Sequence, residues 1–148
     1  MKIGIAADHR GFKLKEKLKA ALPKIKFRDF GTFDEKSVDY PDYAFPLVAA
    51  IQKKEIERGV LICGSGLGMS ISANKGKGIR ACLCLNKEMA KMARNHNDAN
   101  VLVLAANFTK EREAVAILLT FLKEKFEGGR HKRRIDKISY YESHSRCQ

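Results

Sequence analysis

The sequence predicts an α/β fold: a three-layer, Rossmann-like domain with a five-stranded parallel sheet and a C-terminal helix. Two observations carry this prediction. Short runs that are apolar throughout alternate along the chain with segments of helical periodicity. Strands that are apolar on both faces are typical of parallel sheets that helices cover on both sides. The length of 148 residues suits a single domain spanning residues 1–148.

Each element has its own signal in the sequence. Strands are expected at residues 2–7, 25–30, 59–63, 79–85 and 100–105, where the chain is apolar and rich in β-branched residues. Helices are expected at residues 11–22, 43–52, 69–74, 87–94, 110–126 and 133–141. Pro23 ends the first helix, Pro41 precedes the second, and Gly128 and Gly129 follow the fifth. Residues 139–148 form a tail in which we place no motif.

The chain is strongly basic, with 29 Lys and Arg against 17 Asp and Glu, a formal net charge of +12. Residues 10–28 alone hold eight basic side chains and one acidic one. This excess indicates an anionic partner, and it leaves nucleic acid, anionic lipid and a phosphorylated metabolite open. No apolar stretch approaches the roughly 18 residues of a membrane span, so we expect no membrane partner.

The four cysteines, at positions 63, 82, 84 and 147, fit neither a zinc-ligand spacing nor a small disulfide scaffold. We therefore expect free thiols and a reducing, cytoplasmic location. The apolar run after Lys2 stops at Asp8, which is too short for a signal peptide. Cys82 and Cys84 lie two apart in a strand, so both are expected to face the core, whereas Cys147 is expected to be exposed.

The segment CGSGLGMS, at residues 63–70, joins the third strand to the next helix. Its three glycines let backbone N–H groups approach an anion closely. The segment is neither a Walker loop nor a dinucleotide fingerprint, because the residues that define those motifs are absent. A cysteine that faces a helix N-terminus is favoured as the thiolate, which makes Cys63 a candidate nucleophile or base. A tight turn beside a buried structural cysteine remains the alternative.

Three further groups of side chains are candidates for chemistry. Asp8 and His9 follow the first strand, where they suit proton transfer or simply cap a helix. The segment HNDAN, at residues 96–100, offers a polar site or an ordinary turn. Arg130 and Arg134 lie four apart, so on a helix they share one face and can bind one phosphate, or they form a solvated basic helix end.

Taken together, these motifs resemble the type B ribose-5-phosphate isomerases of the ribose/galactose isomerase family. Seven segments occur in that family's order and cover nearly the whole chain. They are IGIAADH (3–9), SVDYPDY (37–43), ICGSGLGMS (62–70), ANK (73–75), GIRA (78–81), HNDAN (96–100) and GGRH (128–131). The resemblance implies an aldose–ketose isomerase that converts ribose 5-phosphate into ribulose 5-phosphate through a cis-enediolate, as part of the pentose phosphate pathway.

The resemblance also implies a role for each candidate residue. Cys63 is the base that moves the proton, because Met69 stands where another branch of the family carries a Glu base. Ser65, where the family usually has Thr, passes the proton between the two substrate oxygens. Asp8 and His96 open the sugar ring. The enediolate is stabilised by Asn74 and by the backbone around Gly66, Gly68, Met69 and Ser70.

The remaining implied contacts bind the substrate. They are Tyr40 and Gly64 in the sugar pocket, Asn97 beside His96, and His9, Arg130 and Arg134 at the phosphate. No cofactor and no metal ion are implied. The family shares its site between the subunits of a homodimer or tetramer, so His96, Asn97 and the two arginines are expected from the neighbouring subunit. Ala105, Ala106 and Asn107 replace a segment that usually contains glycine, which is expected to reshape the pocket wall.

Two alternatives stay open at this point. Within the same enzyme class, the substrate is a six-carbon sugar phosphate, allose or galactose 6-phosphate, because relatives use these. In a different class, the chain is a basic nucleic-acid-binding α/β domain. The second alternative explains the charge of +12 but gives Cys63, the glycine turn and the His96 segment no role, so we expect no nucleic-acid partner.

Overall fold

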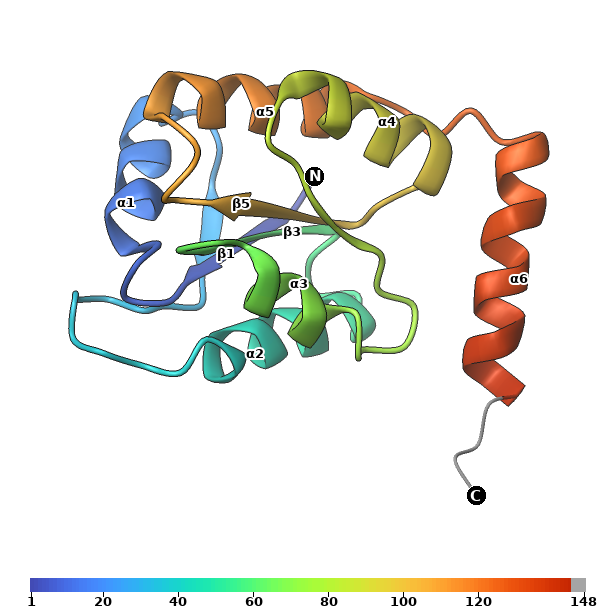
Figure 1. Cartoon of the computed structure of the whole chain (residues 1–148), viewed down its shortest axis with the longest axis horizontal. Coiled ribbons are helices and arrows are strands. Elements are labelled where there is room, and N and C mark those ends of the chain that lie inside the picture. Colours follow the sequence, from blue (N-terminus) through green and yellow to red (C-terminus); the bar gives the residue numbers. More distant parts are fainter. Residues whose placement is uncertain (145–148) are drawn as a thin grey trace.

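The computed structural model describes residues 1–144 and contains one five-stranded sheet (Figure 1). The strands are β1 (Ile3–Ala7), β2 (Phe27–Asp29), β3 (Arg58–Cys63), β4 (Ala81–Leu83) and β5 (Val101–Ala105). Their order is β2-β1-β3-β5-β4, and every neighbouring pair is parallel. All residues of β1 and β5 are buried, as are five of the six in β3, which is the burial expected of strands covered on both faces.

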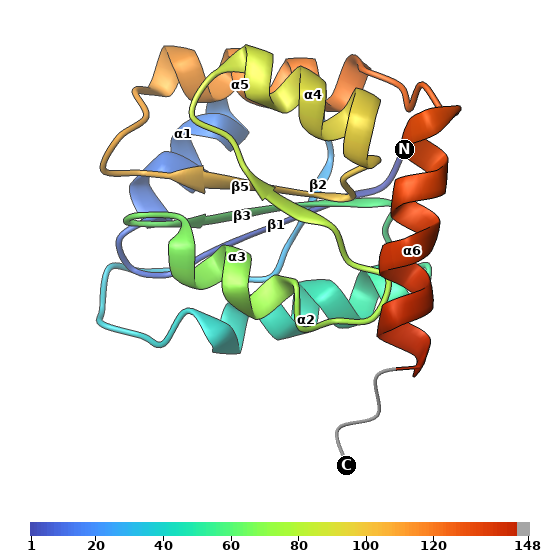
Figure 2. The ribbon, with the colours of Figure 1, turned by 45° about the vertical axis from the view of Figure 1, so that its right-hand side comes forward.

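Helices cover both faces of this sheet (Figures 1 and 2). On one face lie α1 (Phe12–Ala21), α4 (Lys87–Asn97) and α5 (Glu111–Lys123), whose apolar side chains pack on β1, β3 and β5. On the other face lie α2 (Pro41–Gln52) and α3 (Leu67–Ala73), which bury a second apolar cluster. The predicted three-layer α/β fold with a five-stranded parallel sheet is therefore confirmed.

The last helix, α6 (Arg130–His144), stands outside these layers. It lies at the edge where the strands begin, opposite their carboxyl ends (Figures 1 and 2). Glu142 ties it to the body of its own chain by accepting from the N–H of Gly78 through both carboxylate oxygens, at 2.9 and 3.0 Å. Only His131 and Ile135 of this helix are buried, so most of its surface is open.

The boundaries depart from the sequence predictions mainly at the edges. The edge strands β2 and β4 have three residues each, fewer than expected, because an edge strand pairs on one side only. The terminal helix extends beyond the predicted residues 133–141 at both ends, and it includes residues 139–144 of the tail in which no motif was placed. Cys147 lies outside the described residues. Between residues 1 and 144, no helix has the length and apolar character that crossing a bilayer requires.

Candidate functional site

A polar cavity of about 410 Å³ lies at the carboxyl ends of the strands. Four segments line it: the turn after β1, the loop before α2, the loop after β3 and the residue following Ala106. The lining residues are Asp8, His9, Arg10, Ser37, Val38, Asp39, Tyr40, Cys63, Gly64, Ser65, Gly68 and Asn107. Ligands of parallel α/β sheets bind at this edge, so the cavity is the candidate active site.

Cys63 ends β3 and is buried, with 4% of its surface exposed. Its Sγ accepts a hydrogen bond from the N–H of Gly66 at 3.2 Å, which places a donor where negative charge would reside on the sulfur. The backbone reaches this position because Gly66 adopts φ +77°, a left-handed conformation that favours glycine. A Cβ on Gly66 would also lie 2.4 Å from Leu83 Cδ1. The glycine at position 66 thus lets the loop direct its backbone N–H at the Cys63 sulfur.

Asp8 and His9 both lie at the cavity, and both also support local structure. Asp8 Oδ1 accepts from the N–H groups of Arg10 and Gly11, each at 2.9 Å, so this carboxylate closes the turn that leads into α1. His9 Nδ1 lies 3.2 Å from both the N and the O of Val38, which fastens the loop before α2 to the end of β1. The capping role and the cavity position are therefore compatible.

Tyr40 and Ser65 both line the cavity. The Tyr40 ring lies against Gly68: a Cβ on that glycine would be 2.7 Å from Tyr40 Cζ. Ser65 Oγ accepts from the N–H of Leu67 at 3.3 Å and can still donate its own proton. Met69 is fully buried in the core beneath the loop and therefore offers its backbone alone. Ser70 lies one residue further along α3, where its side chain is partly exposed.

The structure does not bring Asn74 to this cavity. Asn74 follows α3, and its side-chain amide donates to the carbonyls of Ser70 and Ala81 and accepts from the N–H of Ala81. These bonds fix the end of α3 to β4. Asn74 instead lines a different depression of about 670 Å³, together with Asn97 and Tyr141 of α6. The expectation that this amide stabilises the enediolate does not fit its placement in the single chain.

His96, Asn97, Arg130 and Arg134 also lie away from Cys63 within one chain. The first two end α4 and the second two begin α6, at the edge where the strands start. The HNDAN segment divides in two. Asp98 accepts from Arg80 and Arg94, and Asn100 bonds to the backbone of Gly78 and Arg80, so both are structural. His96 and Asn97 are the two polar side chains of this segment without such a role.

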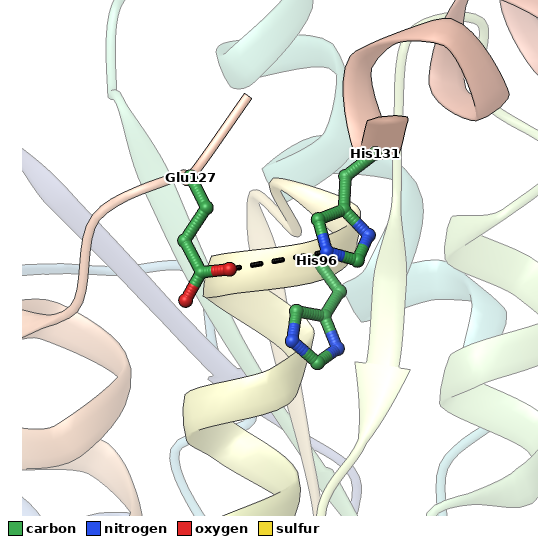
Figure 3. A group of neighbouring side chains, drawn as sticks. All are labelled: His96, Glu127 and His131. Carbon is green, nitrogen blue, oxygen red and sulfur yellow. Dashed lines mark ion pairs between the residues drawn. The ribbon is translucent and has the colours of Figure 1, made fainter. Parts of the chain in front are cut away.

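The ring of His96 packs against the ring of His131, near the start of α6 (Figure 3). It stacks on His131 with ring centroids 4.3 Å apart and planes 9° from parallel. Glu127 Oε2 lies 3.8 Å from His131 Nε2. Burial, with the nearby His96 and Arg130, lowers the pKa of His131 and so favours its neutral ring.

The potential metal-ligand atoms of His96, Glu127 and His131 lie within 4.8 Å of one another, a spacing short enough for a shared metal ion. Imidazole lone pairs lie in the plane of the ring, and nearly parallel stacked rings direct them past a shared ion. We therefore interpret this cluster as a support that orients His96.

The structure adds Arg10 to the cavity residues, and it places Asn107, which the sequence analysis named only as part of an altered segment, in the cavity wall. Both were detectable by the rule used for Asp8, because each comes within three residues of a strand's carboxyl end. Asn107 is anchored by donating its N–H to Gly64 O at 2.9 Å. The altered segment after β5 does form part of the pocket wall, as predicted.

Cys82 and Cys84 pack against the apolar cluster beneath α4 and α5, as expected of core residues. Burial raises the pKa of Cys82, and it raises that of Cys84 to about 12. Both therefore remain thiols and take no part in the chemistry of the cavity. Cys63 is the one cysteine within residues 1–144 that faces the cavity.

The fold and the cavity define an α/β protein with a polar site, lined in part by Cys63, at the carboxyl ends of a parallel sheet. Comparison with known proteins agrees with this class. The Ribose/Galactose Isomerase family model matches residues 3–138, and the chain belongs to that family. The resemblance drawn from the seven sequence segments is thereby confirmed.

Individual relatives are similar over nearly their whole length. The Ribose-5-phosphate isomerase B of Escherichia coli (strain K12) is 39% identical over 95% of this chain and 96% of its own. A ribose-5-phosphate isomerase B structure from Clostridium thermocellum has a TM-score of 0.94 at 47% identity and covers 97% of this chain and 98% of that chain. The Mycoplasma genitalium enzyme, solved with bound ribulose-5-phosphate, has a TM-score of 0.92 at 41% identity, covering 97% of both chains.

Proposed function

We propose that this protein interconverts ribose 5-phosphate and ribulose 5-phosphate. The observation that carries the proposal is the buried Cys63, which faces a polar cavity and accepts a hydrogen bond from Gly66. The family membership supports it, as does the relative from Mycoplasma genitalium whose structure contains ribulose-5-phosphate. The conversion moves one proton from carbon 2 to carbon 1, so it needs a base that can release the proton again.

In the proposed reaction, Cys63 as thiolate removes the proton from carbon 2 of the open-chain aldose, and the resulting thiol returns it to carbon 1. The C2–H electron pair forms the enediol double bond, and the former aldehyde oxygen takes up the negative charge. Ser65 passes a proton between the two oxygens, which lie on the same side of a cis-enediolate. Backbone N–H groups of Gly68 and Met69 stabilise the charged oxygen, because the Gly66 N–H already donates to Cys63 Sγ and the Ser70 N–H to Gly66 O.

The reactive aldehyde is exposed only after the furanose ring opens. We propose Asp8 and His96 for this step, one from each of two subunits. In one chain, His96, Asn97, Arg130 and Arg134 lie at the opposite edge of the sheet from Cys63. A homodimer or tetramer in which a neighbouring copy brings these four side chains to the cavity removes that separation. Free Cys63, Cys82 and Cys84 suit the reducing cytoplasm that we propose as its location.

An isomerase assay on ribose 5-phosphate, with allose 6-phosphate and galactose 6-phosphate in parallel, tests the proposal. We expect the pentose phosphate to give the highest kcat/KM. A hexose phosphate as the better substrate would move the protein to the six-carbon alternative. Absence of turnover with all three sugar phosphates would overturn the proposed isomerase activity. The nucleic-acid alternative loses its support because five of the eight basic side chains in residues 10–28 form ion pairs.

A further inference from the structure

The excess of positive charge in residues 10–28 is mostly neutralised. Five of its eight basic side chains form ion pairs: Lys13 with Glu35, Lys15 with Asp29, Lys17 with Glu111, Lys19 with Asp29 and Arg28 with Glu55. Between residues 1 and 144, Arg10, Lys24 and Lys26 have no ion-pair partner. Of these three, Arg10 is the one that lines the Cys63 cavity.

The stem of Arg10 is fixed beside the reacting centre. A Cβ on Gly64 would lie 2.9 Å from Arg10 Cδ and 3.1 Å from Asn107 Nδ2, so both side chains lie across that glycine. Gly64 stands between Cys63 and Ser65, so the Arg10 stem packs on the loop that carries the proposed base. The residue is exposed overall, and its guanidinium has no hydrogen-bond acceptor among residues 1–144. Its donors are therefore available to a ligand.

Arg10 lies where two cavities adjoin. A second cavity of about 650 Å³ shares Arg10 and Asn107 with the catalytic one. Its wall contains Lys13, Lys17 and Lys110, with Glu111 as its acidic member. The carboxylates of the catalytic cavity belong to Asp8 and Asp39, which are not shared with this second cavity. Arg10 therefore brings an unpaired positive charge to the place where the two cavities meet.

We propose that Arg10 binds the phosphate group of the sugar phosphate and is the cation that each subunit supplies to its own cavity. The guanidinium carries donors in a planar fork that matches two phosphate oxygens. Lys110, which lines the adjoining cavity and forms no ion pair within residues 1–144, adds to the positive potential around it. Arg130 and Arg134 lie on α6, away from Cys63 of the same chain, so they do not supply this charge within one subunit. The inference rests on the proposed function and adds a binding residue to it.

Arg10→Gln tests this assignment, with Lys24→Gln as a control that removes the same charge from an unpaired residue outside the cavity. We expect Arg10→Gln to raise the KM for ribose 5-phosphate about tenfold or more and to change kcat little, because a charge-assisted contact is lost. Unphosphorylated ribose, measured as a poor substrate, should lose no efficiency. Inorganic phosphate should inhibit the variant more weakly. Arg10→Lys, which keeps the charge, should restore part of the affinity.

A fall in kcat/KM that is equal for ribose 5-phosphate and ribose would show a structural role and overturn the proposal. So would an equal effect of Lys24→Gln. Titrating ribose 5-phosphate into Cys63→Ala and into Cys63→Ala/Arg10→Gln measures binding without turnover. A dissociation constant unchanged by the second substitution would remove Arg10 from the site. If the wild type proves inactive as an isomerase, this titration still tests whether Arg10 binds the phosphate. Failure of the Arg10 proposal can therefore be distinguished from failure of the proposed function.

Discussion

The cysteine that we propose as the base lies between a strand and a glycine loop. Parallel pairing of β3 with β1 and β5 fixes the position of Cys63, and the left-handed Gly66 turns its amide toward the sulfur. Neither feature depends on the substrate. The site is therefore preorganised, which is what efficient stabilisation of a developing charge requires.

Ser65 gives a prediction at this scale. Ser65→Ala keeps the loop but removes the hydroxyl that is proposed to move a proton between the substrate oxygens. We expect kcat to fall by about 10²-fold, the usual contribution of a positioned proton-transfer group, with a small change in KM. Ser65→Thr keeps the hydroxyl and serves as the matched control. Steady-state kinetics of the three proteins check this, and a Ser65→Ala variant with normal kcat would exclude the role.

Among the elements, β2 and α1 are joined by a buried ion-pair network. Lys15 is fully buried and donates to Asp29 Oδ1 at 2.7 Å and to Thr32 O at 2.7 Å. Lys19 donates to Asp29 Oδ2 at 2.7 Å. Burial acts to raise the pKa of Asp29, but hydrogen bonds from the two lysines and from Gly31 N–H outweigh it and hold that pKa below its usual value.

Asp29→Asn should therefore destabilise the fold by about 3 kcal/mol, because it leaves the buried Lys15 charge poorly compensated. A carboxyl whose pKa is lowered on folding contributes stability above its unfolded pKa of 3.8 and loses it as pH falls through the lower folded value. Denaturant unfolding from pH 7 down to pH 2 measures both effects. The wild type should lose this contribution below about pH 4. Equal stability of variant and wild type at pH 7 would contradict the account.

The elements also show what sequence alone can predict. Apolar strands and glycine or proline boundaries located every strand and helix, because those signals are local. Asn86 follows β4 at the ligand-binding edge of the sheet, yet it caps α4 by accepting from Met89 N–H. Asn74 was assigned to the site, yet its amide holds β4. A side-chain amide that follows a strand can bond to the backbone or to a ligand. Which of the two it does depends on the groups that the fold brings near it, and the local sequence does not specify those groups.

At the scale of the whole molecule, large apolar side chains are exposed on α3 and on α6, among other places. On α6, Ile138, Tyr140 and Tyr141 are 56%, 66% and 73% exposed. Beside the cavity, Leu67 and Ile71 on α3 are 59% and 63% exposed. Exposed apolar side chains of this size are candidates for the interface of the proposed oligomer. The proposed sharing of the site between subunits needs an interface of this kind.

Mixing two inactive variants tests shared sites. In a dimer of Cys63→Ala with His96→Ala, one site carries both defects and the other carries neither. Random exchange of subunits should therefore restore about a quarter of the wild-type activity. Each variant refolded alone is the control. If His96 served the Cys63 of its own chain, every site in the mixture would contain one defect and no activity would return.

The measurement that tests the central claim most directly is release of the carbon-2 hydrogen. Ribose 5-phosphate labelled with deuterium at carbon 2 is incubated with wild type and with Cys63→Ala, and transfer of the label to solvent and to carbon 1 is followed by NMR. We predict transfer by the wild type and at least about 10²-fold slower transfer by Cys63→Ala, because the base is gone. Transfer at an undiminished rate by correctly folded Cys63→Ala would contradict the assignment of Cys63 as the base.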